Sequence, residues 1–522
     1  MSDQPLVALA TILLLGLLAQ WLAWRLRVPS ILLLLTFGLL AGPVSGVLDP
    51  DELLGDLLLP VVSLSVGVIL FEGGLSLGLR ELRQAGAVVR NLVTLGVVVT
   101  GGIGTAASLV LFDVDSSVAA LIGAIVVVTG PTVIGPLLRQ IRPVGAVGSV
   151  LRVEGILVDP IGALLAVLVF EGILADTLEE AAPAIGLAIL ETLVVGTVAG
   201  LLGAGLLVLV LKRYLVPDAL HNALALGIVV AVFTGADRIQ EESGLFAATV
   251  MGIALASQRI TPVRHILEFS ETLQILLISG LFIVLGARVE TDGLSSVALG
   301  SVGLLAVLVL VARPLAVLVS TFRSRLGRRE RLFLMAMAPR GIVAAAVSSI
   351  FAIRLTELGR PGADTLVPVT FLVVLGSIVI YGVAAPRVAL RLGLSDPDPQ
   401  GVLVVGAHRW ARDIGSVLAE RGVRVVMVDN DRANVVAARL AGFPSVYGSV
   451  LSDRALDEVD LGGIGRMLAL TPNDEVNALA AQQFVPIFGR KNVFQLAPGP
   501  RRPGRARPPE PTCSPGSSSR PT

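Results

Sequence analysis

The chain has 522 residues, of which 54% are hydrophobic and 15% charged, with a formal net charge of zero and a mean hydropathy of +0.84. Soluble domains average about 25% charged residues, so this composition excludes an ordinary soluble protein and indicates an integral membrane protein. A single cysteine, Cys513, excludes a disulfide framework, and three scattered histidines do not predict a metal cluster. We expect no bound transition metal, no catalytic residues of an enzyme and no nucleic-acid partner.

Apolar stretches dominate the first three quarters of the chain. A helix needs about 20 apolar residues to cross the hydrocarbon core of a bilayer. We therefore predict an all-α polytopic membrane domain over residues 1–393 with about 13 transmembrane helices. The predicted spans are 5–24, 30–48, 53–77, 86–112, 116–138, 148–175, 183–211, 219–236, 243–258, 268–287, 294–322, 331–353 and 365–386.

The charges of the connecting loops provide a separate test of this count. Loops that follow odd-numbered spans carry 19 Lys and Arg residues, whereas loops that follow even-numbered spans carry only four. Loops rich in Lys and Arg stay on the cytoplasmic side. We therefore expect a multi-pass protein of the cell membrane with its N-terminus outside and its C-terminal segment in the cytoplasm.

Two of the predicted spans are interrupted by proline and glycine. The fifth contains Thr129, Gly130 and Pro131, and the twelfth contains Pro339, Arg340 and Gly341. Proline removes a helical hydrogen bond, and irregular backbone at membrane depth persists only where it lines a cavity or is buried in protein. Pro and Gly often merely kink membrane helices. Two interruptions seven spans apart instead favour inverted repeats with a binding site at the two broken helices.

Ionisable side chains inside membrane spans are costly, so each is a functional candidate. Asp159 and Glu154 lie in the sixth span, Arg340 in the twelfth and Glu72 near the end of the third. Arg340 is the predicted ion-pair partner of Glu154, because an unpaired guanidinium there would be very costly. The alternative interpretations are a structural carboxylate for Asp159 and an interfacial residue for Glu72.

A buried carboxylate suits exchange chemistry. Desolvation raises its affinity for protons, and a dehydrated small cation can replace the proton if further oxygen ligands are near. Thr129, beside the broken backbone, can supply such an oxygen. We therefore predict an ion and proton site, metal-binding only in the sense of Na⁺ or K⁺, that includes Asp159 and Thr129.

The ordered motifs resemble the cation:proton antiporter family, the NhaP-type sodium/proton exchangers. They are Phe71-Glu72-Gly73-Gly74-Leu75, Thr129-Gly130-Pro131-Thr132, Glu154-Gly155 through Asp159-Pro160, Glu242-Ser243-Gly244-Leu245 and Pro339-Arg340-Gly341-Ile342. The resemblance implies a thirteen-helix homodimer with a role in pH homeostasis, in which the broken fifth and twelfth spans cross at mid-membrane. It further implies that Asp159 binds cation or proton, Thr129 lends an oxygen, Glu154 pairs with Arg340 and Glu72 contributes through water. Many relatives have Asp at the place of Gly130, and one central carboxylate favours electroneutral one-for-one exchange.

Residues 400–496 alternate between strand-like and helix-like patterns, which predicts an α/β Rossmann-like domain. This segment resembles the TrkA-N (RCK) regulatory domain. Gly406 opens the first turn, His408 and Ala411 occupy the second and third glycine positions, and Asp429 stands where ribose hydroxyls bind. NAD(H) or another adenine nucleotide is the expected ligand. Because His408 would crowd a pyrophosphate, a mononucleotide, a cyclic dinucleotide or a purely structural module stay open.

The predicted function is secondary active exchange of Na⁺ or K⁺ for H⁺ by alternating access, regulated by the cytoplasmic domain. The alternatives are a potassium efflux (K⁺/H⁺) system gated by a nucleotide or a glutathione-type ligand, and a nucleotide-sensing membrane regulator that transports nothing. Residues 497–522 are rich in Pro, Arg and Ser, and this composition predicts a disordered tail.

Overall fold

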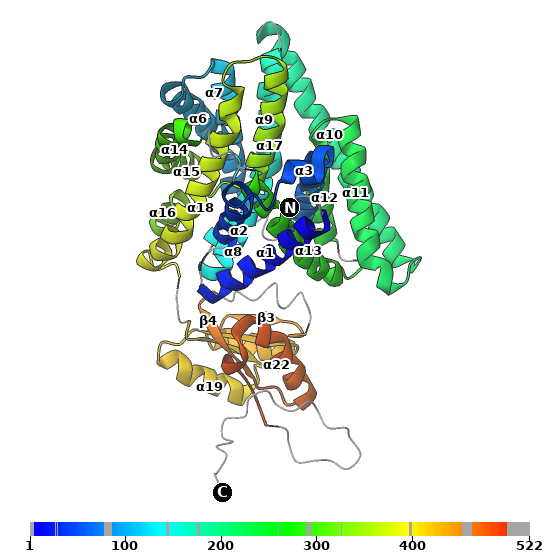
Figure 1. Cartoon of the computed structure of the whole chain (residues 1–522). Coiled ribbons are helices and arrows are strands. Elements are labelled where there is room, and N and C mark those ends of the chain that lie inside the picture. The colour runs from blue at the N-terminus through cyan, green and yellow to red at the C-terminus, as the bar shows by residue number, and fades with distance from the viewer. Residues whose placement is uncertain are drawn as a thin grey trace. The chain divides into compact units, whose positions relative to one another are not determined.

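The chain forms two compact units in a computed structural model (Figure 1). The first comprises residues 1–140 and 146–392, and the second comprises residues 141–145 and 393–522. The structure describes residues 5–26, 28, 30–77, 86–141, 143, 146–174, 178–258, 260–288, 294–324, 326–395, 399–451 and 462–497. All but the first residue of the predicted tail 497–522 therefore lies outside the described residues.

The first unit is helical throughout, as predicted. In chain order it contains α1 (Pro5–Leu26), α2 (Ser30–Leu39), α3 (Pro50–Leu54), α4 (Leu58–Leu75), a helix over Gly86–Leu111 that ends as α6 (Val97–Leu111), α7 (Ser116–Ile125), α8 (Pro131–Ile141), α9 (Val147–Leu174), α10 (Leu178–Lys212), α11 (His221–Ile239), α12 (Ser243–Ser257), α13 (Arg264–Ala287), α14 (Leu294–Val307), α15 (Arg313–Thr321), α16 (Arg328–Met335), α17 (Ile342–Glu357) and α18 (Leu366–Arg391).

Helix occupies each of the thirteen predicted spans. Within the described ranges, eight helices are long and apolar enough to cross a membrane, and a bent pair over 50–75 would make a ninth. The remaining predicted spans correspond to shorter apolar helices, Ser30–Val44, Ser116–Ile125 and Ser243–Ser257, and to the α16–α17 pair. The third span differs from the prediction, because α3 meets the helix that follows at an angle of 77°.

The two interrupted spans are broken as predicted. Residues 126–130 separate α7 from α8, and residues 336–341 separate α16 from α17. The two unwound segments meet, because Thr129 and Arg340 form an antiparallel backbone bridge. Glycine is required at this contact, since a Cβ atom on Gly341 would lie 2.4 Å from the Cα atom of Gly130. The prediction of broken, crossing helices is therefore confirmed.

Small residues also let whole helices approach closely in this unit. A Cβ atom on Gly252 of α12 would lie 2.2 Å from the carbonyl oxygen of Phe71 on α4, and one on Gly74 would lie 2.5 Å from the carbonyl oxygen of Thr249. Backbone contacts of this kind are typical of membrane helices, where lipid supplies little hydrophobic driving force for association. In Figure 1, α10 and α11 lie on the opposite side of the unit from α6, α7 and α14.

The second unit contains a parallel five-stranded sheet with strand order β3-β2-β1-β4-β5. Its elements are β1 (Gly401–Val405), α19 (Arg409–Glu420), β2 (Val425–Asp429), α20 (Arg432–Leu440), β3 (Ser445–Tyr447), β4 (Ile464–Ala469), α22 (Asp474–Phe488) and β5 (Val493–Gln495). Two apolar clusters pack on the sheet, one containing Phe484 and the other containing Phe443. This arrangement is the predicted doubly wound α/β fold, with its switch in strand order between β1 and β4.

Candidate ion-binding site

The crossing of the broken spans lies against the middle of α9. Asp159 projects from α9 and is 1% exposed. Its Oδ1 atom lies 3.7 Å from the position of a Cβ atom on Gly341, next to the crossing. That oxygen has no hydrogen-bond partner among the described residues. A buried carboxylate oxygen without a partner is unfavourable, and such groups concentrate at functional sites.

Thr129 belongs to the unwound segment of the fifth span. The residue is 4% exposed, and its Oγ1 atom is buried and unpartnered in the part of the chain that the structure describes. Its backbone pairs with Arg340, which fixes the segment in an extended conformation. The segment also packs on α9, because a Cβ atom on Gly162 of α9 would lie 2.4 Å from Cγ2 of Val128, the residue before Thr129.

Glu154 forms an ion pair that the sequence did not predict. Both of its carboxylate oxygens accept hydrogen bonds from Arg313 of α15: Nη1 donates to Oε1, and Nη2 donates to Oε2 at 2.9 Å. Arg313 Nε also donates to the carbonyl oxygen of Leu334 at 2.9 Å. The two ion-pairing side chains are about equally buried, at 5% and 4% exposed. A bidentate pair satisfies most of the guanidinium and neutralises the carboxylate.

The predicted Glu154–Arg340 ion pair is therefore wrong. Arg340 Nη1 instead donates to the carbonyl oxygen of Val127 at 2.9 Å, and its backbone N–H donates to Ser377 Oγ of α18 at 3.0 Å. Val127 lies where α7 unwinds, so its carbonyl has lost the next turn of the helix as a donor. Arg340 supplies that missing donor and thus stabilises the broken backbone of the other span.

Glu154, Arg313 and Arg340 nevertheless line one small cavity of about 20 Å³, together with Thr100 and Thr129. A cavity needs about 10–15 Å³ to hold one water molecule. Sequence reasoning missed Arg313, although it is the only charged residue within the apolar run 294–322. That isolation was the signal that could have identified it.

Glu72 lies near the C-terminal end of α4 and is buried, at 6% exposed. Gln274 of α13 donates a hydrogen bond from Nε2 to Glu72 Oε2. Gly73, the next residue, faces α9, since a Cβ atom there would lie 3.4 Å from Ile156 Cγ1. Glu72 thus lies on a helix that contacts α9 one turn before Asp159.

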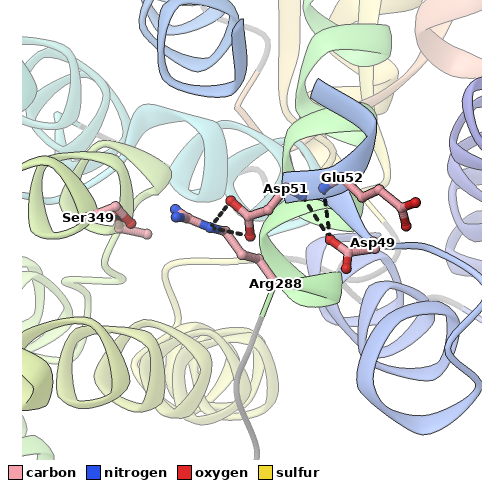
Figure 2. Close-up of polar contacts among 6 residues, drawn as sticks. Asp49, Asp51, Glu52, Arg288 and Ser349 are labelled. Atoms are coloured by element: carbon pink, nitrogen blue, oxygen red, sulfur yellow. Dashed lines mark hydrogen bonds and ion pairs between the residues drawn. The ribbon is translucent and has the colours of Figure 1, made fainter. Parts of the chain in front are cut away.

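Other ion pairs lie away from the crossing. Figure 2 shows Arg288, at the end of α13, with its guanidinium directed toward Asp51 of α3; Nε lies 3.1 Å and 3.0 Å from the two carboxylate oxygens. Asp49 caps α3 by accepting hydrogen bonds from the backbone N–H groups of Asp51 and Glu52. These contacts fix the short helix α3 and do not reach Asp159.

The second unit brings the four predicted nucleotide residues to the carboxyl ends of β1 and β2. Gly406 has a φ of 100°, which favours glycine, and Ala411 is fully buried. Asp429 Oδ2 accepts from Ala407 N–H at 2.7 Å and from Asn434 Nδ2 at 3.1 Å. This carboxylate therefore holds the first turn in place at the end of β2.

His408 occupies the second glycine position. Its Cε1 atom lies 3.1 Å from the position of a Cβ atom on Gly406, and its ring meets Trp410 edge-on at 4.6 Å between centroids. Burial lowers the pKa of His408, which favours the neutral imidazole. As N-cap residue it makes no side-chain bond to α19, so the first N–H groups of that helix stay available to an anion. The turn, the helix end and Asp429 follow the pattern of a Rossmann-like nucleotide-binding fold, and the imidazole is the feature that departs from that pattern.

Comparison with known protein families identifies both units of the chain. The sodium/hydrogen exchanger transmembrane family matches residues 9–391, and the TrkA-N domain family matches residues 402–497. The chain therefore belongs to the sodium/hydrogen exchanger family and carries a C-terminal TrkA-N domain, a nucleotide-binding Rossmann-like fold. Both predicted resemblances are confirmed.

The individual relatives are named as antiporters of two different cations, K⁺ and Na⁺. The chain is 27% identical over 397 residues to the K(+)/H(+) antiporter NhaP2 of Shewanella sp. (strain MR-4), covering 74% of this chain and 67% of the relative. It is 26% identical over 417 residues to Na(+)/H(+) antiporter 1 of Methanocaldococcus jannaschii, covering 73% and 94%. The solved structure of the sodium proton antiporter MjNhaP1 from that organism aligns with a TM-score of 0.65 at 23% identity, covering 74% of this chain and 98% of that one, and so shares its fold.

Proposed function

We propose that the membrane unit is a secondary active antiporter that exchanges Na⁺ or K⁺ for H⁺ by alternating access. The observation that carries this proposal is Asp159, a buried carboxylate beside the crossing whose Oδ1 lacks a partner among the described groups. Either a proton or a monovalent cation would relieve this uncompensated charge. Because one carboxylate accommodates only one of them at a time, movement of the site between the two membrane faces couples the two fluxes.

The residues around Asp159 take different roles in this proposal. Thr129 supplies a hydroxyl oxygen to the dehydrated cation, since its Oγ1 is buried and lacks a partner within the described ranges. Glu72, which is buried near the end of α4, contributes to the site through water. Glu154, neutralised by Arg313, and Arg340, bonded to Val127, maintain the crossing and do not bind the ion.

The proposal extends to the setting of the unit. The asymmetry of loop charges supports a multi-pass protein of the cell membrane with its N-terminus outside and the TrkA-N domain in the cytoplasm. The family resemblance supports a homodimer. The fit of Asp429 and the α19 N-terminus supports regulation by an adenine nucleotide, such as NAD(H), with the ribose at Asp429.

Transport by proteoliposomes tests the central claim. Purified wild-type protein and Asp159→Asn are reconstituted with a pH-sensitive dye, an outward proton gradient is imposed, and NaCl, KCl or choline chloride is added. We expect wild type to dissipate the gradient with NaCl, KCl or both, but not with choline. Asp159→Asn should show no cation-dependent signal, because the amide neither releases a proton nor balances a cation.

The matched control is Asp113→Asn, the same chemical change at an exposed residue after α6. It should keep wild-type exchange. Full exchange by folded Asp159→Asn would contradict the site assignment. Absence of exchange by wild type with both cations, while the protein still binds nucleotide, would instead support a membrane regulator that transports nothing.

A further inference from the structure

Arg354 connects two groups of helices at one end of the membrane unit. It lies in the last turn of α17 and forms an ion pair with Glu241, in the turn between α11 and α12. Nη1 lies 3.2 Å from Oε2, and Nη2 lies 3.4 Å from Oε1. Both residues follow even-numbered predicted spans, so the loop charges predict that this end of the unit faces outward.

Arg354 packs on the helix that carries the ion site. Its guanidinium lies over the ring of Phe170 of α9, 5.9 Å from the ring centroid. That ring packs against Phe351 of α17, with 4.8 Å between centroids, and both phenylalanines are buried. Phe170 lies about three helical turns after Asp159 on α9. The guanidinium is therefore held by the two helices that meet at the ion site.

Glu241 belongs to a turn that is closely fixed to α11. Asp237 accepts a hydrogen bond at 2.9 Å from the backbone N–H of Glu242, which has a left-handed φ of 64° that residues other than glycine rarely adopt. A Cβ atom on Gly244 would lie 2.7 Å from the carbonyl oxygen of Phe233. The sequence motif that begins at Glu242 thus fixes the direction of the chain next to Glu241.

The turn continues into α12, which is in backbone contact with α4 and α10. A Cβ atom on Gly252 of α12 would lie 2.2 Å from the carbonyl oxygen of Phe71 on α4, and one on Gly200 of α10 would lie 2.6 Å from the carbonyl oxygen of Ala247 on α12. Contacts of this kind make the three helices a tightly packed group. The ion pair therefore ties α9 and α17 to this group.

We propose that the Arg354–Glu241 ion pair is a latch that closes the outward side of the ion site and breaks once in each transport cycle. The proposal rests on the exchange function proposed above, because access to the site changes only if the helices that carry it move relative to their neighbours. In this structure the pair is formed and Asp159 is buried. The two side chains are 42% and 61% exposed, and an exposed ion pair is weak enough to break and form repeatedly.

Crosslinking tests whether the contact must break. The chain has one cysteine, so Cys513→Ser gives a cysteine-free background. In that background, Glu241→Cys/Arg354→Cys is reconstituted in proteoliposomes and treated with a short bis-methanethiosulfonate, and peptide mass spectrometry confirms the link. We expect Na⁺- or K⁺-driven exchange to fall at least about tenfold, because a tethered latch cannot open. Dithiothreitol, which cleaves the link, should restore exchange.

The control pair is Asp51→Cys/Arg288→Cys in the same background. Asp51 and Arg288 also form a partly exposed ion pair, but it joins α3 to α13 and involves neither α9 nor α17. The crosslinked control should therefore keep its exchange activity.

Charge variants in right-side-out membrane vesicles test the ion pair itself. Glu241→Gln and Arg354→Gln should each lower the apparent KM for Na⁺ or K⁺ added outside about two- to fivefold, because loss of a weak ion pair raises the population open to that side. Combining the two substitutions should lower KM no further. Glu241→Arg/Arg354→Glu should restore the wild-type KM, and Asp51→Asn should leave it unchanged.

Exchange that persists after crosslinking of the latch would overturn the inference, as would an equal loss in the control pair or an unchanged KM in both charge variants. If the cysteine pair fails to fold, the KM comparison decides alone. When wild type exchanges and Asp159→Asn does not, these results overturn only the latch. Exchange by Asp159→Asn, or no exchange by wild type, would overturn the proposed function itself.

Discussion

At the scale of single residues, the buried charges of the membrane unit divide by their partners. Glu154 and Arg313 neutralise each other, and Arg340 bonds a carbonyl at the break of the other span. Removing one member of a buried ion pair leaves an uncompensated charge, whereas removing both members leaves none. This difference makes the pairing testable, and it separates the observed pair from the one that the sequence predicted.

Arg313→Met and Glu154→Gln should each reduce the free energy of unfolding by about 3–5 kcal/mol. Each variant should therefore show a lower thermal unfolding midpoint than the purified wild-type protein. The double variant Arg313→Met/Glu154→Gln should recover much of that loss. Arg340→Met combined with Glu154→Gln should recover none, because those two side chains do not share an ion pair. Recovery in the second combination and not in the first would contradict the structure described here.

The number of charges moved per cycle follows from the residues at the crossing. Position 130, next to Thr129 in the unwound segment, is a glycine, so Asp159 is the single titratable ligand of the proposed site. We expect electroneutral exchange: a membrane potential set with valinomycin, in Na⁺-driven assays, should leave the initial rate unchanged. A rate that follows the potential would show that unequal numbers of protons and cations move per cycle.

At the scale of elements, the crossing depends on the close approach of Gly341 to Gly130, which leaves no room for a side chain on Gly341. A Cβ atom on Gly341 would lie 2.4 Å from Gly130 Cα, and backbone cannot yield as a flexible side chain can. Gly135 of α8, in the same broken span, has open space around the corresponding position. The two positions therefore differ in packing although both are glycines near the break.

Gly341→Ala should separate the two unwound segments, with a loss of exchange and a destabilisation of about 1–3 kcal/mol or more. Gly135→Ala should keep exchange and slightly stabilise α8, because alanine is the better helix former. Dye-based transport and thermal unfolding measure both effects. Wild-type exchange by Gly341→Ala would mean that close approach of the segments is not needed.

At the scale of the whole molecule, the two units combine an ion-exchange fold with a nucleotide-binding fold. In the full-length protein, titration with NADH, NAD⁺, ATP and AMP should produce saturable binding by at least one of them. Asp429→Ala should weaken that binding about tenfold, because it removes the proposed acceptor for ribose hydroxyls. His408→Gly should strengthen dinucleotide binding relative to mononucleotide binding, because it opens the crevice. No binding of any of the four would indicate a structural module.

Local sequence signals predicted the fold well. Length and apolarity of the spans, together with Pro131 and Pro339, were sufficient to predict where the helices break, and alternating patterns predicted the α/β unit. The burial of Asp159 beside the crossing also followed from its sequence context. The partner of Glu154 did not, because sequence spacing says nothing about which distant helices face each other. Arg340 was chosen because it belongs to a recognisable motif, whereas the observed partner, Arg313, belongs to α15, which carries none of the motifs.

The backbone bridge between Thr129 and Arg340 has a consequence for how the ion site changes sides. The bridge, the Arg340–Val127 hydrogen bond and the contact of the two glycines join the halves of both broken spans into a common frame. Such a frame resists sliding of one broken span along the other. Exposure of Asp159 to opposite compartments is therefore expected to come from displacement of this frame as one body against neighbouring helices such as α4, α12 and α13, with the bound ion carried along.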